Sequence, residues 1–251
     1  MKKQLAAWAV GAAMLGLSGV AVADTLAKVK QSGVFTIGHR DASIPLSYYD
    51  DKQQPIGYSM DICQKVAEAV KKELNLPKME VKYQLVTSAN RIPLLANGTV
   101  DIECGSTTNI KQVTELNAAQ NLGINIVSAN GHAESFLMVE TGRAVAFAMD
   151  DILLAGLVAN SKTPGDFEIS SEALSVEPYG IMVRKDDPKF KKLADGVVTG
   201  LMTSGEINKI YDKWFLKSIP PKNINMNIPM SANLKRVVAK PTDSPDPAAY
   251  Q

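Results

Sequence analysis

The sequence predicts an α/β fold in which parallel strands are covered by helices. Short apolar runs typical of strands are followed repeatedly by longer segments whose apolar residues recur at helical spacing. In residues 59–74, for example, Ile62, Val66 and Val70 fall on one face of a helix. Strands that alternate with helices in this way favour β-α-β units and parallel sheets.

The elements follow one another along most of the chain. Strands are expected at residues 34–38, 81–86, 100–104, 124–128, 144–149 and 179–184. Helices are expected at residues 59–74, 90–96, 110–121, 135–140, 151–160, 188–203 and 206–215. Asn97-Gly98 and Ser204-Gly205 supply stop signals after two of these helices. The tail after residue 219 is rich in Pro and Asn, and we expect it to wrap the surface.

The N-terminus has the pattern of a secretory signal peptide at residues 1–23. Lys2 and Lys3 precede an uncharged apolar run at 5–17, and residues 21–23 read Ala-Val-Ala, a small-residue cleavage site before Asp24. A membrane anchor is the disfavoured alternative, because the run is short and ends in a cleavage site. No cysteine follows the run, so a lipid anchor is not indicated there, and we expect a free exported protein.

The charge balance argues against a polyanionic partner. Removal of residues 1–23 takes away two lysines and leaves 25 basic and 26 acidic side chains. A chain this close to neutral has no electrostatic basis for binding nucleic acid or an anionic membrane. The remaining 228 residues are enough for one large domain or two small ones.

The two cysteines, Cys63 and Cys104, fall in a predicted helix and at the end of a predicted strand. An oxidising compartment permits a disulfide, but buried cysteines also pack well as free thiols. We expect two buried free thiols, and their pairing stays open. Together with His39 and His132 they lack the spacing of a metal site, so no metal and no other cofactor is expected.

Polar residues gather where the predicted strands end. In open parallel sheets, ligands bind beyond the carboxyl ends of the strands. The candidate residues at those ends are, in chain order, His39, Arg40, Ser88, Arg91, Ser106, Thr107, Thr108, His132, Asp150 and Asp151. Arginine binds carboxylates with two parallel hydrogen bonds, hydroxyl groups bind anionic oxygens, and a carboxylate neutralises an ammonium group. The set therefore suits an amino acid with an additional acidic group.

Each residue also has a purely structural interpretation. Asp150 or Asp151 is expected to cap the following helix, a contribution of about 1 kcal/mol. Ser88 or Asn90 is a candidate cap for the helix expected at 90–96. Arginines most often lie on the protein surface. Taken singly, most of these residues are better explained structurally, and only their matching positions favour a site. Catalytic motifs such as a P-loop, G-x-G-x-x-G or G-x-S-x-G are absent from the sequence.

Five runs carry a resemblance to a known family. They are GHRDASIPLSYYD (38–50), TSANRIPLLANGTVDIECGSTTN (87–109), HAESFLMVETGRAVAFAMDD (132–151), YGIMVRKDDPKFKKL (179–193) and IPPKNINMN (219–227). They resemble the periplasmic glutamate/aspartate-binding proteins of ABC importers, which are family 3 extracellular solute-binding proteins. The resemblance implies a periplasmic monomer, with L-glutamate or L-aspartate as ligand and the membrane subunits of an ABC importer as partners.

The resemblance also implies a two-lobed, type II periplasmic-binding-protein-like fold. Lobe one would comprise residues 25–108 and 184–251, and lobe two residues 109–183. Residues matching Arg40, Arg91 and His132 would hold the side-chain carboxylate of the ligand. Residues matching Ser88, Ser106 and Thr108 would add hydrogen bonds from their hydroxyl groups. The residue matching Asp150 would bind the ammonium group of the ligand.

The resemblance breaks after Asn109. In the family, the GSTTN run is followed by an arginine that clamps the ligand's α-carboxylate, by a hinge strand and by a second Thr-rich motif. Here the run continues directly into residues 110–113, and no arginine lies between Arg91 and Arg143. We therefore expect several dozen residues to be missing and lobe two to be incomplete. A binding-impaired form of the family stays open as an alternative, as does, less favoured, a dehydratase-type enzyme on the same scaffold.

Overall fold

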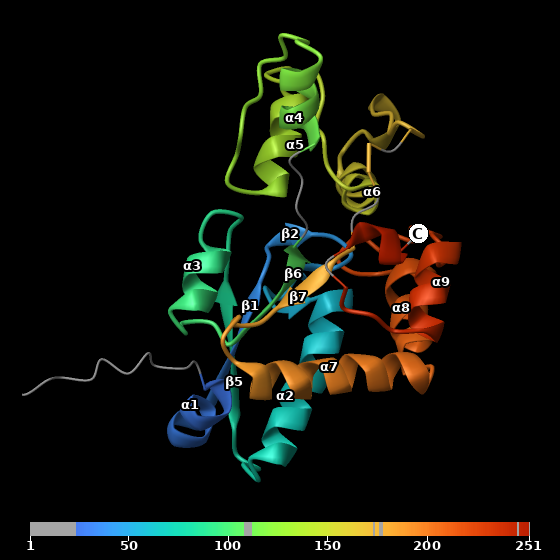
Figure 1. Ribbon diagram of the computed structural model, residues 1–251. Helices are drawn as coiled ribbons and strands as arrows, with labels where there is room; N and C mark the ends of the chain where they lie inside the picture. The colour runs from blue at the N-terminus through green and yellow to red at the C-terminus, as the bar shows by residue number, and fades with distance from the viewer. Residues whose placement is uncertain (1–23, 108–111, 173, 176–177, 245, 251) are drawn as a thin grey trace, which may run out of the picture.

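The computed structural model describes residues 24–107, 112–172, 174–175, 178–244 and 246–250. The expected signal peptide at 1–23 and the candidate ligand residue Thr108 lie outside these ranges. Figure 1 shows a body built from both ends of the chain and, above it, a separate part that residues 112–172 form. None of the helices in the described ranges is long and apolar enough to cross a lipid bilayer.

The body is organised around a four-stranded sheet with the order β5-β1-β6-β7. Strand β1 (Val34–His39) pairs in parallel with β5 (Glu80–Leu85) and with β6 (Ile102–Thr107), as the sequence predicts. Strand β7 (Gly180–Met182) pairs with β6 in the antiparallel sense, which the alternation of strands and helices does not reveal. A second, antiparallel sheet of β2 (Ala42–Ser43), β3 (Ser47–Tyr49) and β4 (Pro55–Ile56) was not predicted.

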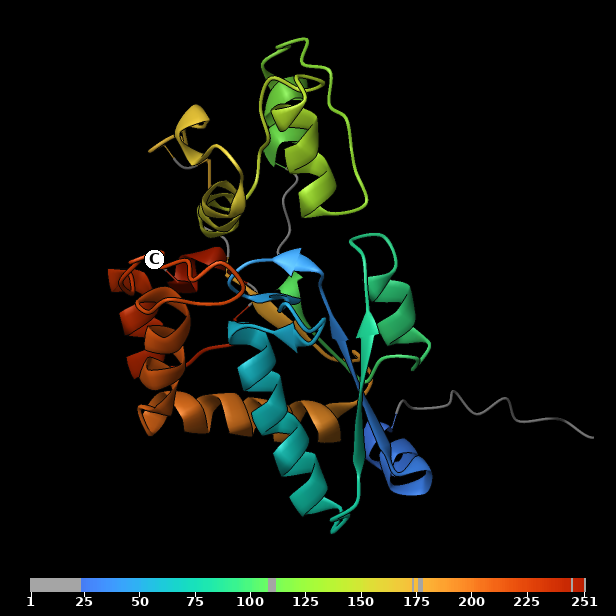
Figure 2. The same cartoon turned by 180° about the vertical axis from the view of Figure 1, so that it is seen from behind.

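Helices cover the sheet and form the separate part. The nine α-helices of the described ranges are α1 (Thr25–Ser32), α2 (Tyr58–Glu73), α3 (Arg91–Ala96), α4 (Gln112–Ala119), α5 (His132–Glu140), α6 (Asp151–Asn160), α7 (Pro188–Thr203), α8 (Glu206–Phe215) and α9 (Ala232–Ala239). Helix α9 lies in the tail that we expected to wrap the surface, where no helix was predicted; the hydroxyl of Ser231 caps it by accepting from Leu234 N at 3.1 Å. Figure 2 shows α2 and α7 crossing beneath the sheet, at the end away from α4 and α5.

Two buried clusters form the core of the body. In the first, Val66 and Val70 of α2 meet Phe35 and Ile37 of β1 and Phe190 of α7. Their spacing on α2 is the helical period read from the sequence, and burial of each such side chain contributes roughly 1.5–3 kcal/mol. The second cluster surrounds the small sheet and includes helix α8.

Helix α6 is attached to this second cluster. Leu153 is buried among its residues, and Gly156 lies so close to Ile44 that an added Cβ would stand 2.3 Å from the Ile44 carbonyl oxygen. The C-terminal end of α6 is held by Lys222, whose Nζ donates to the carbonyl of Asn160. Part of the segment between β6 and β7 is therefore packed on the body itself.

A disulfide joins Cys63 of α2 to Cys104 of β6, so the expectation of free thiols is wrong. Both cysteines face the interface between the helix and the sheet and are fully buried, with their Cα atoms 6.3 Å apart. One turn earlier on α2, the hydroxyl of Ser59 donates to Gly105 O at 2.9 Å. Helix α2 thus holds the end of β6 through one covalent and one hydrogen bond.

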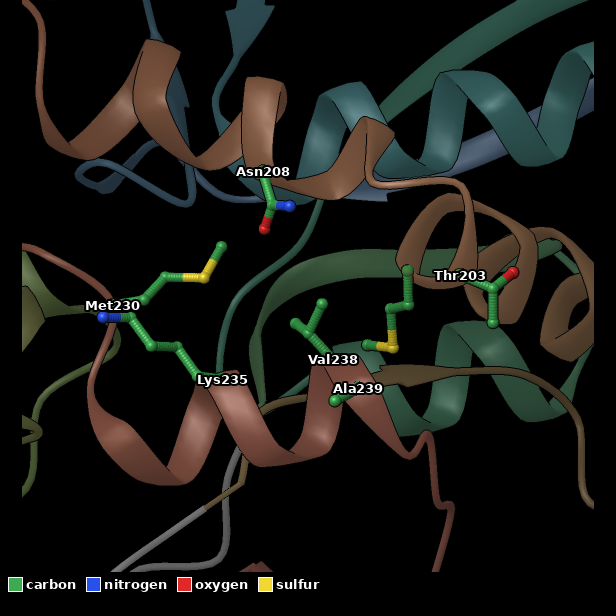
Figure 3. Close-up of a pocket in the computed structure, with 7 residues that line it drawn as sticks. Thr203, Asn208, Met230, Lys235, Val238 and Ala239 are labelled. Carbon is green, nitrogen blue, oxygen red and sulfur yellow. The ribbon is translucent and has the colours of Figure 1, made fainter.

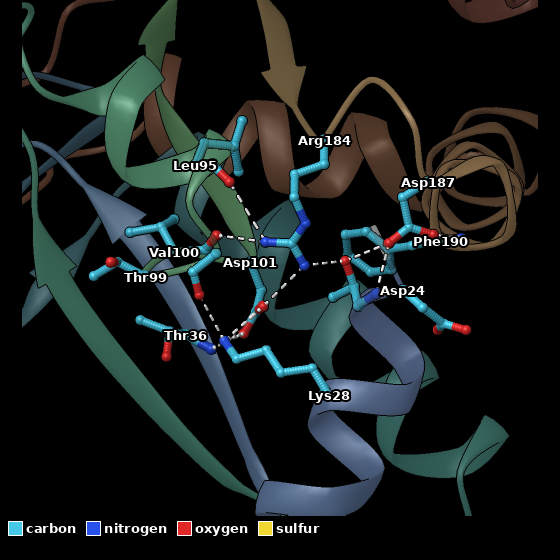
Figure 4. Close-up of polar contacts among 12 residues, drawn as sticks. Asp24, Lys28, Thr36, Leu95, Thr99, Val100, Asp101, Arg184, Asp187 and Phe190 are labelled. Carbon is cyan, nitrogen blue, oxygen red and sulfur yellow. Dashed lines mark hydrogen bonds and ion pairs between the residues drawn. The ribbon is translucent and has the colours of Figure 1, made fainter. Parts of the chain in front are cut away.

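A buried polar network fastens the opposite end of the sheet (Figure 4). Asp101, fully buried just before β6, forms an ion pair with Lys28 at 2.9 Å and with Arg184 at 3.5 Å. Arg184 also donates to Thr25 Oγ1 at 2.5 Å. Asp187 accepts from both the backbone N–H and the hydroxyl of Thr25, at 2.6 and 2.5 Å. The network ties α1 to β6 and to the segment that returns after β7.

The described residues between β6 and β7 contain helices but no strand, so the strands expected at 124–128 and 144–149 are wrong. Ile124, Val127 and Val145 are exposed rather than packed in a sheet. The side chain of Asn117 accepts from Ile124 N and donates to Ile124 O, both at 2.9 Å, where a strand would use a neighbour. A strand is stable only when its backbone groups find a ladder partner.

Candidate functional site

Arg40 is the centre of the candidate site. It follows β1 directly and is only 1% exposed. Its backbone N–H donates to Ser47 Oγ at 2.9 Å, and its Nη1 donates to Ser88 Oγ at 3.1 Å. Burial first, and then the positive charge of Arg91, lower the pKa of Arg40. The charge of Arg91 therefore acts on Arg40, and the negative charges of Asp41 and Glu103 act in the opposite direction.

His132 reaches the same place from the separate part of the molecule. It begins α5 and is 8% exposed, with Nδ1 3.0 Å from the hydroxyl of Ser43. Ser106, at the end of β6, donates to the same hydroxyl at 3.2 Å. Burial, followed by the charges of Arg40 and Arg91, lowers the pKa of His132 to about 4. The imidazole is therefore neutral at pH 7.

Asp150 lies at the start of α6. It occupies the cap position, but its carboxylate makes no cap hydrogen bond, so of the two candidates Asp150 and Asp151 it is not the one that caps the helix through its side chain. The neighbouring carboxylate of Asp151 accepts from Ile152 N at 2.7 Å. The hydroxyl of Tyr179 hydrogen-bonds to Asp150; burial of that hydroxyl first, and then the negative charge of Asp150, raise the pKa of Tyr179.

The predicted residues thus meet in part. Arg40 binds Ser88, and an added Cβ on Gly131 would stand 3.8 Å from Arg40 Nη2, which places the start of α5 beside the guanidinium group. Ser106 and His132 meet at Ser43. Arg91 acts on Arg40 and His132 through its charge. Asp150 hydrogen-bonds to Tyr179.

Two contributors were missed from the sequence. Ser43 gave no signal, because it lies in a two-residue strand of a sheet that was not predicted. Glu103 alternates with apolar residues in the strand expected at 100–104, a pattern typical of a solvent-facing side chain, yet it is fully buried. The negative charge of Glu103 acts on Arg40 and raises its pKa, against the effect of burial. A side chain added at Gly105 would have to displace the Glu103 carboxylate.

A surface pocket of about 410 Å³ lies apart from this cluster (Figure 3). It is formed by the end of α7, by α8 and by the tail helix α9, and it is lined by Met202, Thr203, Asn208, Met230, Lys235, Val238 and Ala239. Its mostly apolar lining has one charged group, Lys235, and no pair of cations that matches a dicarboxylate. The strand-end cluster is therefore the better candidate site.

The chain is similar to proteins of known role over most of its length. It is 48% identical to the L-glutamate/L-aspartate-binding protein of Pseudomonas aeruginosa, over 90% of this chain and 93% of that protein. It is 41% identical to the glutamate/aspartate import solute-binding protein of Escherichia coli, over 94% of each chain.

The length of these alignments shows that this chain is shorter in its interior. The first spans 280 positions, although it includes only 90% of a chain of 251 residues, or about 226 residues. The second spans 285 positions and includes about 236 residues. About 50 positions of each alignment therefore have no counterpart here, which agrees with the several dozen missing residues expected from the sequence.

Solved structures confirm the fold class. The model resembles ArgBP from T. maritima with a TM-score of 0.64 at 21% identity, over 76% of this chain and 98% of that one. It resembles a solute receptor for L-cysteine of Neisseria gonorrhoeae with a TM-score of 0.60 at 18% identity, over 76% and 94% of the two chains. The fold is thus α/β, of the two-lobed, type II periplasmic-binding-protein kind.

The family model described as bacterial extracellular solute-binding proteins, family 3, matches residues 35–217. This range includes Arg40, which follows β1, Ser106 in β6, and the helices that begin with Arg91 and His132. The chain belongs to the bacterial extracellular solute-binding proteins, family 3.

Proposed function

We propose that this chain is a periplasmic solute-binding protein that captures L-glutamate or L-aspartate for an ABC amino-acid importer. The observation that carries the proposal is the group of Arg40, Arg91 and His132: Arg40 and His132 are buried, and the charges of both arginines act on the neutral imidazole. The names of the relatives from Pseudomonas aeruginosa and Escherichia coli support the same ligands.

The charges of this group favour an acidic side chain. The charge of Arg91 disfavours the charged state of Arg40, and both arginines disfavour a charged His132, so positive charges repel one another in this cluster. A ligand carboxylate placed between them would relieve this repulsion and accept charge-assisted hydrogen bonds. The hydroxyl groups of Ser88 and Ser106 lie where they would complete the shell of donors, and Thr108 is proposed as a third.

The ammonium group of the ligand is assigned to Asp150. The carboxylate of Asp150 already accepts from the Tyr179 hydroxyl, which orients it. Neither group lies on the body's main sheet strands: Asp150 precedes α6 and Tyr179 precedes β7. A ligand held by Arg40 on one side and by Asp150 on the other would link the two parts of the chain.

We assign lobe one to residues 25–108 and 184–251 and an incomplete lobe two to residues 109–183. The positions missing relative to the two named relatives are placed after Asn109, where the sequence joins two Thr-rich motifs. The absence of strands among the described residues of 112–179 supports this placement, since a lobe that has lost a central strand cannot form its sheet. Export by the signal peptide at 1–23, a monomeric state and docking to membrane subunits belong to the same proposal.

The shortened interior favours one alternative, a binding-impaired form of the same family. The arginine that would clamp the α-carboxylate has no equivalent between Arg91 and Arg143. Loss of one charged partner costs several kcal/mol when the group it served is buried. We therefore propose that binding is retained but weaker than in a full-length relative. A dehydratase-type activity has no support in the cluster, which is suited to holding charge.

A thermal unfolding experiment tests the proposal. The exported chain is heated alone and with millimolar L-glutamate, L-aspartate or L-glutamine, which differs from glutamate only in its neutral side chain. A ligand that binds only the folded state raises the unfolding temperature. We expect both acidic amino acids, and not glutamine, to raise it. A cooperative transition that none of the three moves would support the binding-impaired form and end the proposal of capture.

A further inference from the structure

Ser43 links the two parts of the candidate site. It lies in β2, is 1% exposed, and its hydroxyl oxygen stands 3.2 Å from Ser106 Oγ and 3.0 Å from His132 Nδ1. The three side chains come from β2, from the end of β6 and from the start of α5. Neither the sequence nor the relatives' names assign a role to Ser43, yet it is the group that joins Ser106 to His132.

The hydrogen bonds of Ser43 bear on the protonation of the imidazole. With Ser106 as the donor to Ser43 Oγ, the single hydroxyl proton of Ser43 is left for its other neighbour, His132 Nδ1. A neutral imidazole that accepts at Nδ1 carries its proton at Nε2. The chain of donors Ser106 to Ser43 to His132 thus selects one of the two tautomers.

We propose that Ser43 is a positioning residue that holds His132 in the Nε2–H tautomer, so that the imidazole offers a hydrogen-bond donor to an acidic ligand. This inference rests on the proposed function for its ligand, but the tautomer itself is a property of the protein alone. In the other tautomer the Nε2 lone pair would face the ligand's carboxylate, and the two would repel.

The electrostatic surroundings support a neutral ring. The charged groups that act on His132 are Arg40, which follows β1, and Arg91, which begins α3. Both disfavour an imidazolium ion, and burial acts in the same direction, so the pKa of His132 is about 4. At pH 7 the ring therefore has one proton on its nitrogens. The nitrogen that carries this proton decides whether the imidazole donates a hydrogen bond to the ligand's carboxylate or repels it.

A second histidine in the chain serves as a reference for the tautomer of His132. His39 and His132 are its two histidines. His39 Nδ1 lies 2.9 Å from the carbonyl oxygen of Arg40, which can only accept, so His39 must carry its proton at Nδ1. Its Nε2 lies 3.5 Å from the Tyr49 hydroxyl. The two histidines are thus expected to be opposite tautomers in one molecule.

Two-dimensional ¹H–¹⁵N correlation spectra of the ring protons, recorded on ¹⁵N-histidine-labelled protein at pH 7, test the inference. The pattern of cross-peaks distinguishes the two neutral tautomers and the imidazolium ion. We expect the Nε2–H pattern for His132 and the Nδ1–H pattern for His39. An Nδ1–H or imidazolium pattern for His132 in the unaltered protein would overturn the proposal, without any variant having to fold.

A pair of variants tests the role of the hydroxyl. Ser43→Ala should shift His132 to a mixture of tautomers and leave His39 unchanged, while Ser135→Ala, a hydroxyl loss on the same helix as His132, should alter neither. Calorimetry should show glutamate binding weakened roughly three- to tenfold by Ser43→Ala and unchanged by Ser135→Ala. An unchanged His132 pattern in Ser43→Ala would refute the role of Ser43. Absence of glutamate heat in the unaltered protein would count against the proposed function and leave the tautomer assignment standing.

Discussion

Gly156 of α6 lies directly against the backbone of Ile44, beside the small antiparallel sheet. An added Cβ at Gly156 would stand 2.3 Å from the Ile44 carbonyl oxygen and 3.1 Å from its Cβ. This approach packs the helix that follows Asp150 onto the body, where Leu153 is buried in the core. The position of Asp150 therefore depends on a contact that permits no side chain.

Gly156→Ala should consequently destabilise the protein, although alanine favours helices. We expect a loss of about 1–3 kcal/mol in the free energy of unfolding, the usual cost of forcing atoms into a packed core. Gly196→Ala is the matched control, because Gly196 lies within α7 with open space at its Cβ position and should gain about 0.5–1 kcal/mol. Urea unfolding measures both. An equal change in the free energy of unfolding for Gly156→Ala and Gly196→Ala would show that α6 is not packed on Ile44.

The disulfide between Cys63 and Cys104 should be a main source of stability. The two cysteines are 41 residues apart, and cross-links over such loops typically contribute roughly 2–4 kcal/mol. The double variant Cys63→Ala/Cys104→Ala should lose about that amount in urea unfolding. Thiol titration of the oxidised protein in denaturant is the direct check: we expect no reactive thiol, and two would show that the cysteines are free.

Stability should fall as the pH is lowered below neutrality. The pKa of His132 is about 4 in the folded protein, below its ordinary value of 6.5, so the unfolded chain binds a proton that the folded one does not. The contribution of this group is complete above pH 6.5 and is lost towards pH 4. Between pH 7.5 and 5 the loss from His132 should be roughly 2 kcal/mol.

The variant His132→Gln isolates this effect. Its stability should change less between pH 7.5 and 5 than that of the unaltered protein, as measured by urea unfolding at each pH. The pKa of His39 is also lowered by burial, so His39→Gln is needed to separate the two contributions. An identical pH dependence with and without His132 would contradict the account of a buried imidazole between two arginines.

Asp101 is expected to be the most sensitive member of the polar network. It is fully buried between Lys28 and Arg184 and accepts from Thr36 N at 2.9 Å. Asp101→Asn removes the charge that compensates two cations, and breaking a buried pair in this way costs about 3–5 kcal/mol. Asp51→Asn, at an exposed turn, should leave the unfolding midpoint unchanged. A similar midpoint for both variants would mean that the network adds little stability.

The body was largely predictable from the sequence, because its elements have strong local signals. The helical period in α2 and the apolar runs of β1 and β6 correspond to what the structure buries, with bounds that differ by a few residues. Strand β5 was also predicted, although most of its side chains are exposed. Strands β1 and β5 end within one residue of the expected positions, so Arg40 and Ser88 lie beyond strand ends as predicted, whereas Ser106 lies within β6. Such signals arise because one face of each element is buried, and the spacing of apolar residues along the sequence indicates that face.

Features that depend on distant partners were not predictable. The runs at 124–128 and 144–149 have the composition of strands, but whether a strand forms depends on a neighbouring strand, and the described residues between β6 and β7 form none. The pairing of Cys63 with Cys104, the antiparallel direction of β7 and the burial of Asp101 and Glu103 all depend on which elements meet. The role of Ser43 arises in the same way, from three elements converging on one hydroxyl.

Isothermal titration of Arg40→Met with L-glutamate, beside the unaltered protein and Arg236→Met, tests the central claim most directly. Arg40 is buried at the site, whereas Arg236 is exposed on α9 and bonds to Asn233 at 2.7 Å. We predict binding heat for the unaltered protein and for Arg236→Met, and its loss in a folded Arg40→Met. Equal affinity in Arg40→Met and Arg236→Met, or no heat from a cooperatively folded unaltered protein, would contradict the claim that this cluster captures an acidic amino acid.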